Sequence, residues 1–184
     1  PEFALNDCGD MDYVIKGEGE MAFPQLLSNL DGPMGIPGVY YRRDGDIVGT
    51  PPQLIRNLDS LEYPWGVLDP EEYFGLHIHG MSSRSRKSVP VLSTRGCPYG
   101  CTFCSTSKVH GKRVRIRSVE NFLGELEFLV NLFDVREVQV VDDNFTFYRE
   151  RAYAIAEGII DRNLGINWTL PNGSLSSRIV NICN

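Results

Sequence analysis

The stretch that decides the fold is VPVLSTRGCPYGCTFC, residues 89–104. Its first part, Val89–Ser93, is a short apolar run, and such a run predicts a buried strand. The loop that follows contains Pro98 and Gly100, two residue types that supply turn geometry. The same loop contains three of the chain's five cysteines. The sequence therefore predicts a strand that runs directly into a cysteine-rich loop.

Helices and strands alternate after this loop. Val119–Phe133 carries apolar residues at helical spacing behind Ser118, a typical N-cap, so we expect a helix there. Glu137–Val141 predicts a second strand, a second helix is expected from about Tyr148 to Asn163, and Ile166–Leu170 predicts a third strand. This order is typical of an α/β fold with a parallel sheet or barrel, in which the chemistry lies at the carboxyl ends of the strands.

The three clustered cysteines are Cys97, Cys101 and Cys104, and their C-x3-C-x2-C spacing favours a metal site over disulfides. Pairing within so tight a triplet always leaves one cysteine over. Three thiolates can bind three irons of a [4Fe–4S] cluster and leave the fourth iron open to another ligand. A tetrahedral zinc site needs four ligands, and His110 is the nearest candidate for the fourth. The residues alone leave both kinds of site open.

The charge of the chain is unevenly distributed. Its formal net charge is −6, but residues 84–117 contain nine basic side chains and no acidic one. Such a stretch can stabilise an anionic cluster or cofactor, contact nucleic acid, or be a solvated loop. Contact with nucleic acid is not favoured, because the cysteines lie inside the stretch. Arg115 and Arg117 are candidates for contact with a carboxylate or phosphate, and equally for exposure to solvent.

Composition excludes several broad classes. A chain of 184 residues, 42% apolar and 23% charged, is an ordinary globular protein rather than a disordered one. No apolar window is long enough for a transmembrane helix and no signal segment opens the chain, so we expect a cytoplasmic protein. The chain starts with Pro1 rather than Met, which indicates a fragment of a longer protein.

The cysteine loop resembles the motif of the radical S-adenosylmethionine (SAM) superfamily, in which an aromatic residue precedes the third cysteine. Phe103 stands at that place, and the flanks Ser93–Pro98 and Arg113–Ser118 also match. The resemblance implies the first half of a partial (β/α)6 barrel. It also implies a [4Fe–4S] cluster whose open iron binds SAM, and an electron donor of the flavodoxin or ferredoxin type. Reductive cleavage of SAM would give a 5′-deoxyadenosyl radical that abstracts hydrogen from a small-molecule or lipid-like substrate.

The resemblance extends to the end of the second strand. Related proteins have a D-D-N-F-T segment there, which is Asp142–Thr146 in this chain. The resemblance implies that Asp142, Asp143 and Asn144 contact SAM and that Phe103 lies beside its adenine. A turn that only closes the strand is the alternative for the three polar residues. No catalytic residue can be named from the sequence.

The first 31 residues resemble the end of the Rossmann-like cobalamin-binding domain that precedes many radical SAM domains. Asp12–Ile15 predicts a strand, Gly17–Glu20 reads G-E-G-E, and a helix is expected to run to about Leu30. Cobalamin is therefore implied as a cofactor by the family alone. A glycine-rich turn that merely joins the strand to the helix is the alternative. The residues expected to be buried on this helix are Phe23, Leu26, Leu27 and Leu30.

Three regions are expected along the chain. Residues 1–31 would be the end of the cobalamin-binding-like domain, 32–83 a hairpin and a proline-rich linker, and 84–184 the truncated N-terminal half of the radical SAM core. The hairpin is predicted over Val39–Thr50 with its turn at Asp44–Gly45. The remaining cysteines and the H-x-H pair are expected to be structural or incidental, with Cys8 buried: Cys8, Cys183, His77 and His79.

Several functions agree with this pattern. With cobalamin, transfer of a methyl group to an unactivated carbon is the leading expectation, and ring closure or rearrangement is also compatible. A methylthiotransferase that acts on tRNA is an alternative within the same superfamily. A non-enzymatic zinc module completed by His110 is the alternative outside it.

Overall fold

The computed structural model describes residues 1–75 and 83–172, and the chain divides into two compact units. Unit 1 comprises Pro1–Arg56 and Tyr99–Lys112, and unit 2 comprises Asn57–Pro98 and the residues from Arg113 onward. Within the described residues, no helix has the length and apolar character needed to cross a membrane. The predictions for His77, His79 and Cys183 lie outside the described residues.

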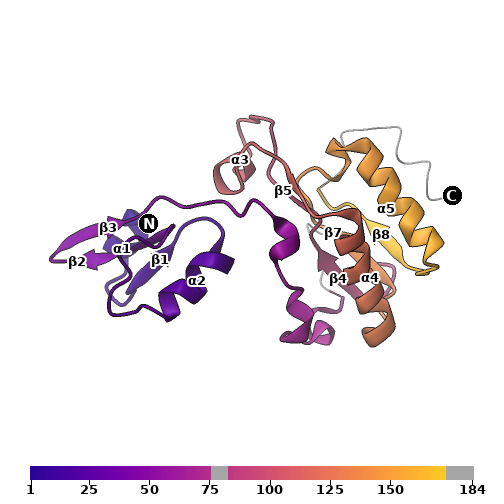
Figure 1. Cartoon of the computed structure of the whole chain (residues 1–184), viewed down its shortest axis with the longest axis horizontal. Coiled ribbons are helices and arrows are strands. Elements are labelled where there is room, and N and C mark those ends of the chain that lie inside the picture. The colour runs from indigo at the N-terminus through magenta and orange to yellow at the C-terminus, as the bar shows by residue number, and fades with distance from the viewer. Residues whose placement is uncertain (76–82, 173–184) are drawn as a thin grey trace. The chain divides into compact units, whose positions relative to one another are not determined.

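A parallel three-stranded sheet lies at the centre of unit 2 (Figure 1). Strand β7 (Glu137–Val140) pairs with β4 (Ser88–Val91) on one side and with β8 (Asn167–Thr169) on the other. Helix α4 (Val119–Phe133) precedes β7, and helix α5 (Arg149–Asp161) joins β7 to β8. The predicted α/β fold and its order of elements are confirmed. The place of this sheet in a partial barrel stays a prediction.

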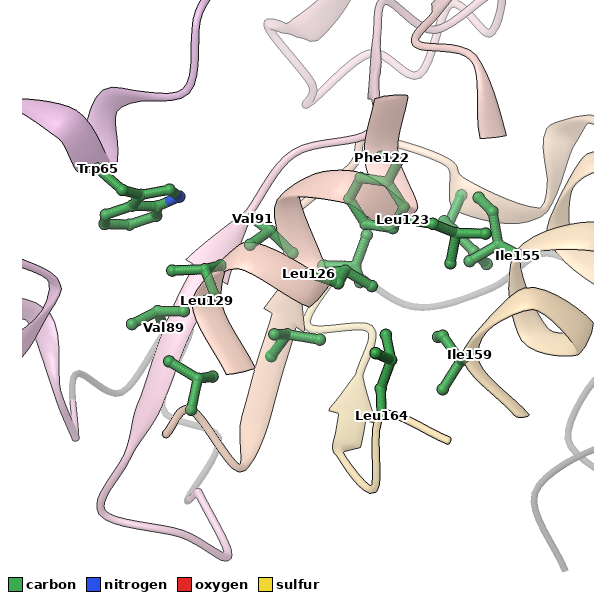
Figure 2. Close-up of a cluster of buried hydrophobic side chains, with 14 of the residues drawn as sticks. Trp65, Val89, Val91, Phe122, Leu123, Leu126, Leu129, Ile155, Ile159 and Leu164 are labelled. Atoms are coloured by element: carbon green, nitrogen blue, oxygen red, sulfur yellow. The ribbon is translucent and has the colours of Figure 1, made fainter. Parts of the chain in front are cut away.

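The core of unit 2 lies between the sheet and the two helices. Figure 2 shows Val89 and Val91 of β4 facing Leu126 and Leu129 of α4. Helix α5 contributes a second apolar stripe to the same cluster. Burial of these stripes is the main favourable free energy available to the unit. The other fully or nearly fully buried members on the strands, the helices and the adjoining turns are Phe122, Leu123, Val135, Val138, Val140, Phe145, Ala152, Ile155, Ile159 and Leu164.

Helices α4 and α5 pack closely at a glycine. A Cβ atom on Gly158 of α5 would lie 2.2 Å from Cδ1 of Leu123 on α4, a distance that real Cβ atoms do not reach. The absent side chain lets the two helices approach each other over this point.

Residues 57–75 were assigned to a linker by the sequence, but the structure packs them on unit 2. They form three short 3-10 helices, η1 (Leu58–Ser60), η2 (Pro64–Gly66) and η3 (Pro70–Tyr73). Trp65 of η2 is buried in the core cluster. Its indole N–H donates a 2.7 Å hydrogen bond to Glu125 of α4. A proline-rich sequence without periodicity therefore contains a large core residue, Trp65, which the sequence pattern did not predict.

Glu125 also pairs with a cation. The side chain of Arg117, which is only 11% exposed, donates a hydrogen bond to the second carboxylate oxygen of Glu125. The same guanidinium donates to the backbone carbonyl of Leu92 at 2.8 Å and to Asn121 at 2.7 Å. Arg117 is thus paired within the chain rather than solvated, which settles one of the alternatives left open by the sequence.

Unit 1 contains a small antiparallel sheet. Strand β1 (Tyr13–Ile15) pairs with β2 (Val39–Arg43), and β2 pairs with β3 (Asp46–Gly49) in the predicted hairpin. Helices α1 (Glu2–Asp7) and α2 (Gly19–Leu27) belong to the same unit. The hairpin is confirmed. The boundary expected after residue 31 falls between strands that share one sheet, and the Rossmann-like character of this region stays a prediction.

Two burial predictions for unit 1 are wrong. Helix α2 buries only Ala22 and Leu26, because the sheet beneath it is narrow, whereas 48–56% of Phe23, Leu27 and Leu30 is exposed. The helix also ends at Leu27 rather than near Leu30.

The second wrong prediction concerns Cys8, which is exposed rather than buried. It follows the short helix α1, which buries only Leu5.

Truncation of Leu126 tests the core of unit 2. Leu126 is fully buried on α4, so Leu126→Ala is expected to lower the free energy of unfolding by about 2–5 kcal/mol through lost burial and a cavity. Leu132→Ala on the same helix is the matched control, because Leu132 is 64% exposed and its change should stay within about 0.5 kcal/mol. Urea unfolding of both variants measures the difference, and equal losses would contradict the assigned helix face.

The buried ion pair is tested by a second matched pair on α4. Glu125→Ala leaves the largely buried side chain of Arg117 without its carboxylate and should cost about 3–5 kcal/mol. Glu127→Ala removes one of the two carboxylates that pair with Arg162, Glu120 being the other, and a carboxylate that is 47% exposed contributes less than about 1 kcal/mol. A loss at Glu125 no larger than that at Glu127 in urea unfolding would show that the buried pair is not important for stability.

Candidate functional site

The cysteine motif begins where β4 ends. Ser93 lies two residues beyond β4, and β5 (Thr94–Arg95) then pairs antiparallel with β6 (Arg115–Ile116). Gly96 follows with φ +97°, a backbone conformation that favours glycine, and Cys97 comes next, partly exposed. Neither of the short strands β5 and β6 was predicted. They bring the segment that enters the motif beside the segment that leaves it.

The other two cysteines lie in unit 1. Both Cys101 and Cys104 are exposed, and the amide of Cys104 donates a 3.1 Å hydrogen bond to the carbonyl of Cys101. This turn keeps the two cysteines close along the chain. No disulfide links the cysteines at positions 8, 97, 101 and 104, so the three thiols of the motif are present as thiols. Three thiolates with exposed positions are the donor set that an iron–sulfur cluster uses.

The described residues contain no group of three potential metal-binding side chains in one place. His110, the candidate fourth zinc ligand, has its Nδ1 atom 3.6 Å from the carboxylate of Glu18. Glu18 is buried and also accepts a 2.7 Å hydrogen bond from the amide of Ile55. The second residue of the G-E-G-E stretch thus joins three segments of unit 1.

Phe103 has the exposure expected of a residue that contacts a ligand. Its ring is 92% exposed, on the cysteine loop of unit 1. A large aromatic ring so open to water offers its face for stacking. Its predicted contact with the adenine of SAM stays a prediction.

Asp142 lies at the carboxyl end of β7, beside the segment that enters the motif. Only 1% of the residue is exposed. Its Oδ1 accepts hydrogen bonds from the amides of Ser93 at 2.6 Å and Thr94 at 3.0 Å, and its Oδ2 accepts one from the Ser93 hydroxyl at 2.5 Å. Burial raises the pKa of Asp142, and the hydrogen bonds from Ser93 and Thr94 act in the opposite direction. Its oxygens therefore face the chain itself.

Arg151 of α5 is the buried cation beside Asp142. It donates to the hydroxyl of Ser93 at 3.1 Å and to the carbonyl of Ser93 at 3.2 Å. It also donates to the carbonyl of Arg117 at 2.9 and 3.0 Å. Burial lowers the pKa of Arg151, and the charge of Asp142 opposes that shift.

The two residues after Asp142 differ in exposure. Asp143 is partly exposed, and its Oδ2 lies 3.3 Å from the amide of Gly96, which donates to it. Asn144 is buried. All three polar residues predicted at this strand end are thus brought to the edge of the sheet from which the cysteine motif departs. Their predicted contact with SAM stays a prediction.

Sequence reasoning missed Ser93 as a bridging residue and Arg151 altogether. The sequence places Ser93 at the end of a strand and in the flank before Cys97, with no sign of a bridging role, and Arg151 is one charged residue in an amphipathic helix. A buried arginine next to the apolar stripe of a helix gives no sequence signal that separates it from a solvated one. Within the basic stretch of residues 84–117, Arg115 is buried and Arg117 is paired with Glu125, so these two of the nine basic residues are not simply solvated.

Comparison with a protein-family model identifies residues 91–180 as a match to the radical SAM superfamily. The matched region begins at the last residue of β4 and includes all three cysteines of the motif. It also includes the strand end with Asp142.

Relatives extend the similarity over most of the chain. An uncharacterized methyltransferase of Pyrococcus horikoshii is 35% identical over 176 residues, which are 92% of this chain and 36% of the relative. The fold resembles TsrM from Kitasatospora setae, a radical SAM methyltransferase solved with tryptophan and a SAM analogue (TM-score 0.66, 21% identity, 88% of this chain and 31% of that one). It also resembles OxsB, a cobalamin-dependent radical enzyme solved with aqua-cobalamin and SAM (TM-score 0.62, 19% identity, 91% and 24%).

The chain thus spans about a third of the length of the proteins it matches. Because the two solved structures are less than 25% identical to this chain, the similarity to them establishes the fold alone. The family model, the similarity to the Pyrococcus protein and the cysteine motif agree with one another. The chain therefore belongs to the radical SAM superfamily.

Proposed function

We propose that this chain is part of a radical SAM enzyme in which Cys97, Cys101 and Cys104 bind a [4Fe–4S] cluster and SAM binds the open iron. The observation that carries the proposal is the cysteine motif itself, which starts at the carboxyl end of a parallel strand inside a match to the superfamily. That end of a parallel sheet is where α/β folds place their chemistry.

The chemistry of the motif's donor set fits such a cluster. The motif supplies three thiols that are not in disulfides and are at least partly exposed. Thiolates are the ligands that iron–sulfur clusters require, and three of them leave one iron for SAM. When bound, the cluster supplies the electron that cleaves SAM reductively and so starts radical chemistry on the substrate.

The chain's own residues orient SAM in this proposal. Phe103 offers an exposed ring on which an adenine can stack. Asp143, partly exposed just beyond β7, is the proposed contact for the cationic amine of SAM, and Asn144 lies next to it. An electron donor of the flavodoxin or ferredoxin type and a small-molecule or lipid-like substrate belong to the same proposal.

Methyl transfer with cobalamin is the favoured outcome for this protein. The proposal is supported by the Pyrococcus relative, which is called a methyltransferase, and by the likeness to TsrM and to cobalamin-bound OxsB. Nucleic acid is not the favoured substrate, since within the basic stretch Arg115 is buried and the charge of Arg117 is paired with Glu125. A tRNA methylthiotransferase is the alternative within the superfamily.

Removal of each motif cysteine tests the cluster. Anaerobic reconstitution with iron and sulfide should give about four irons per chain, and Cys97→Ala, Cys101→Ala or Cys104→Ala should each lose most of that iron. Cys8→Ala is the matched control, because Cys8 is also exposed and not in a disulfide, and it should leave the iron content unchanged. A colourless protein with one zinc that is lost in His110→Ala would instead establish the zinc module.

Addition of SAM tests the open iron. The electron paramagnetic resonance (EPR) signal of the reduced cluster should change when SAM binds, and Phe103→Ala should raise the SAM concentration needed for that change by roughly tenfold, the value of a lost aromatic stack. Tyr99→Ala is the control, because Tyr99 is an exposed aromatic residue of the same loop outside the motif's aromatic position. A cluster signal that SAM leaves unchanged would overturn the proposal of an open iron.

A further inference from the structure

The four residues that precede Cys97 are held by three different elements of unit 2. Thr94 and Arg95 pair with β6, and the amide of Arg117 donates a 3.0 Å hydrogen bond to the carbonyl of Ser93. The end of β7 and helix α5 make the other contacts. A segment that three elements contact has little conformational freedom.

The contacts from the end of β7 are made by Asp142 and Asp143, two consecutive aspartates just beyond the strand. Asp142 accepts three hydrogen bonds from Ser93 and Thr94, and Asp143 accepts one from the amide of Gly96. Together with the pairing of Thr94 and Arg95 with β6, these bonds give each of the four residues before Cys97 a contact from another element. Hydrogen bonds to a carboxylate are about twice as strong as those between neutral groups, so this strand end is a strong anchor for the backbone.

The hydroxyl of Ser93 joins the two buried charges. It donates to Asp142 and accepts from Arg151, because a carboxylate only accepts and a guanidinium only donates. Asp142 is 1% exposed and Arg151 is 8% exposed. A buried charge without a partner is costly, so each of the two charges requires the other to stay in place.

We propose that Asp142 and Arg151 are positioning residues that fix Cys97 for the cluster, and that Asp142 does not bind SAM. The inference rests on the proposed function of the motif. It reassigns Asp142 from the cofactor contact expected from the sequence, because both of its carboxylate oxygens accept hydrogen bonds from the segment that leads into Cys97. The inference leaves the predicted contact of Asp143 with SAM unchanged.

Asp142→Asn is the variant that tests the charge while keeping the shape. The amide oxygen can still accept from the two backbone amides, but Arg151 loses its buried counter-charge. Glu137→Gln is the matched control, because Glu137 is a fully buried carboxylate at the other end of β7 and accepts from the amides of Arg84 and Ser85. The control makes the same chemical change far along the strand from the motif.

Three readouts separate positioning from binding of SAM. In Asp142→Asn, amide hydrogen exchange of residues 93–96 in the metal-free protein should be about tenfold faster than in the wild type. Iron retained after gel filtration should fall severalfold, and the EPR signal of the reduced cluster should change before SAM is added. The SAM concentration for the half-maximal spectral change should stay within about threefold. Glu137→Gln should affect only the exchange of residues 84–85.

The opposite pattern would overturn the inference. If Asp142→Asn keeps the iron, the cluster signal and the exchange of residues 93–96 but weakens SAM binding tenfold or more, Asp142 is a SAM ligand. If Asp142→Asn does not fold, Ser93→Ala decides, because it removes only the bridging hydroxyl, and unchanged exchange there rejects the network.

Failure of the proposed function would give a different result. In that case the wild-type protein itself takes up no cluster. Exchange of residues 93–96 in the metal-free protein then decides by itself whether Asp142 holds this segment, and equal exchange in wild type and Asp142→Asn rejects it.

Discussion

The hydrogen bonds that the carboxylate of Asp142 accepts are the interaction on which the arrangement of the site depends. They link the carboxyl end of β7 to the residues that leave β4, at the edge where parallel strands present their loops. Without this link, two neighbouring strands would end in two independent loops. With it, the cysteine motif begins from a backbone whose position is set by the sheet.

A buried charge near the sheet requires compensation, and the surrounding elements supply it. Arg151 reaches the same serine from α5, and Arg117 occupies the next position along the segment after β6. Arg117 is in turn neutralised by Glu125 on α4, which also accepts from Trp65. Both helices of the unit therefore contribute a charge to one connected polar layer above an otherwise apolar core. Such a layer fixes one arrangement of strands and helices, because any other leaves charges unpaired in a medium of low dielectric constant.

The residues of this polar layer support the site, and other residues are left exposed to contact a ligand. The thiols of the motif and the ring of Phe103 are at least partly exposed, whereas the side chains that hold the loop are buried. Groups that bind a cofactor must reach it, and groups that hold them in place work best when their own contacts are complete. The division between exposed motif residues and buried supporting residues is the pattern expected of a preorganised site.

The sequence by itself determined the elements and the chemistry. The period of the apolar residues located α4 to the residue and β7 to within one, and the spacing of Cys97, Cys101 and Cys104 indicated the metal chemistry, because both signals are local. The tertiary structure decided what the charged and small residues do. Asp142, Ser93 and Arg151 lie up to 58 residues apart and meet only when β4, β7 and α5 come together. Long-range packing also explains why α2 buries fewer apolar residues than the sequence predicted and why Trp65, in a segment predicted to be a linker, is a core residue. Burial depends on the width of the surface a segment packs against, and no local pattern records that width.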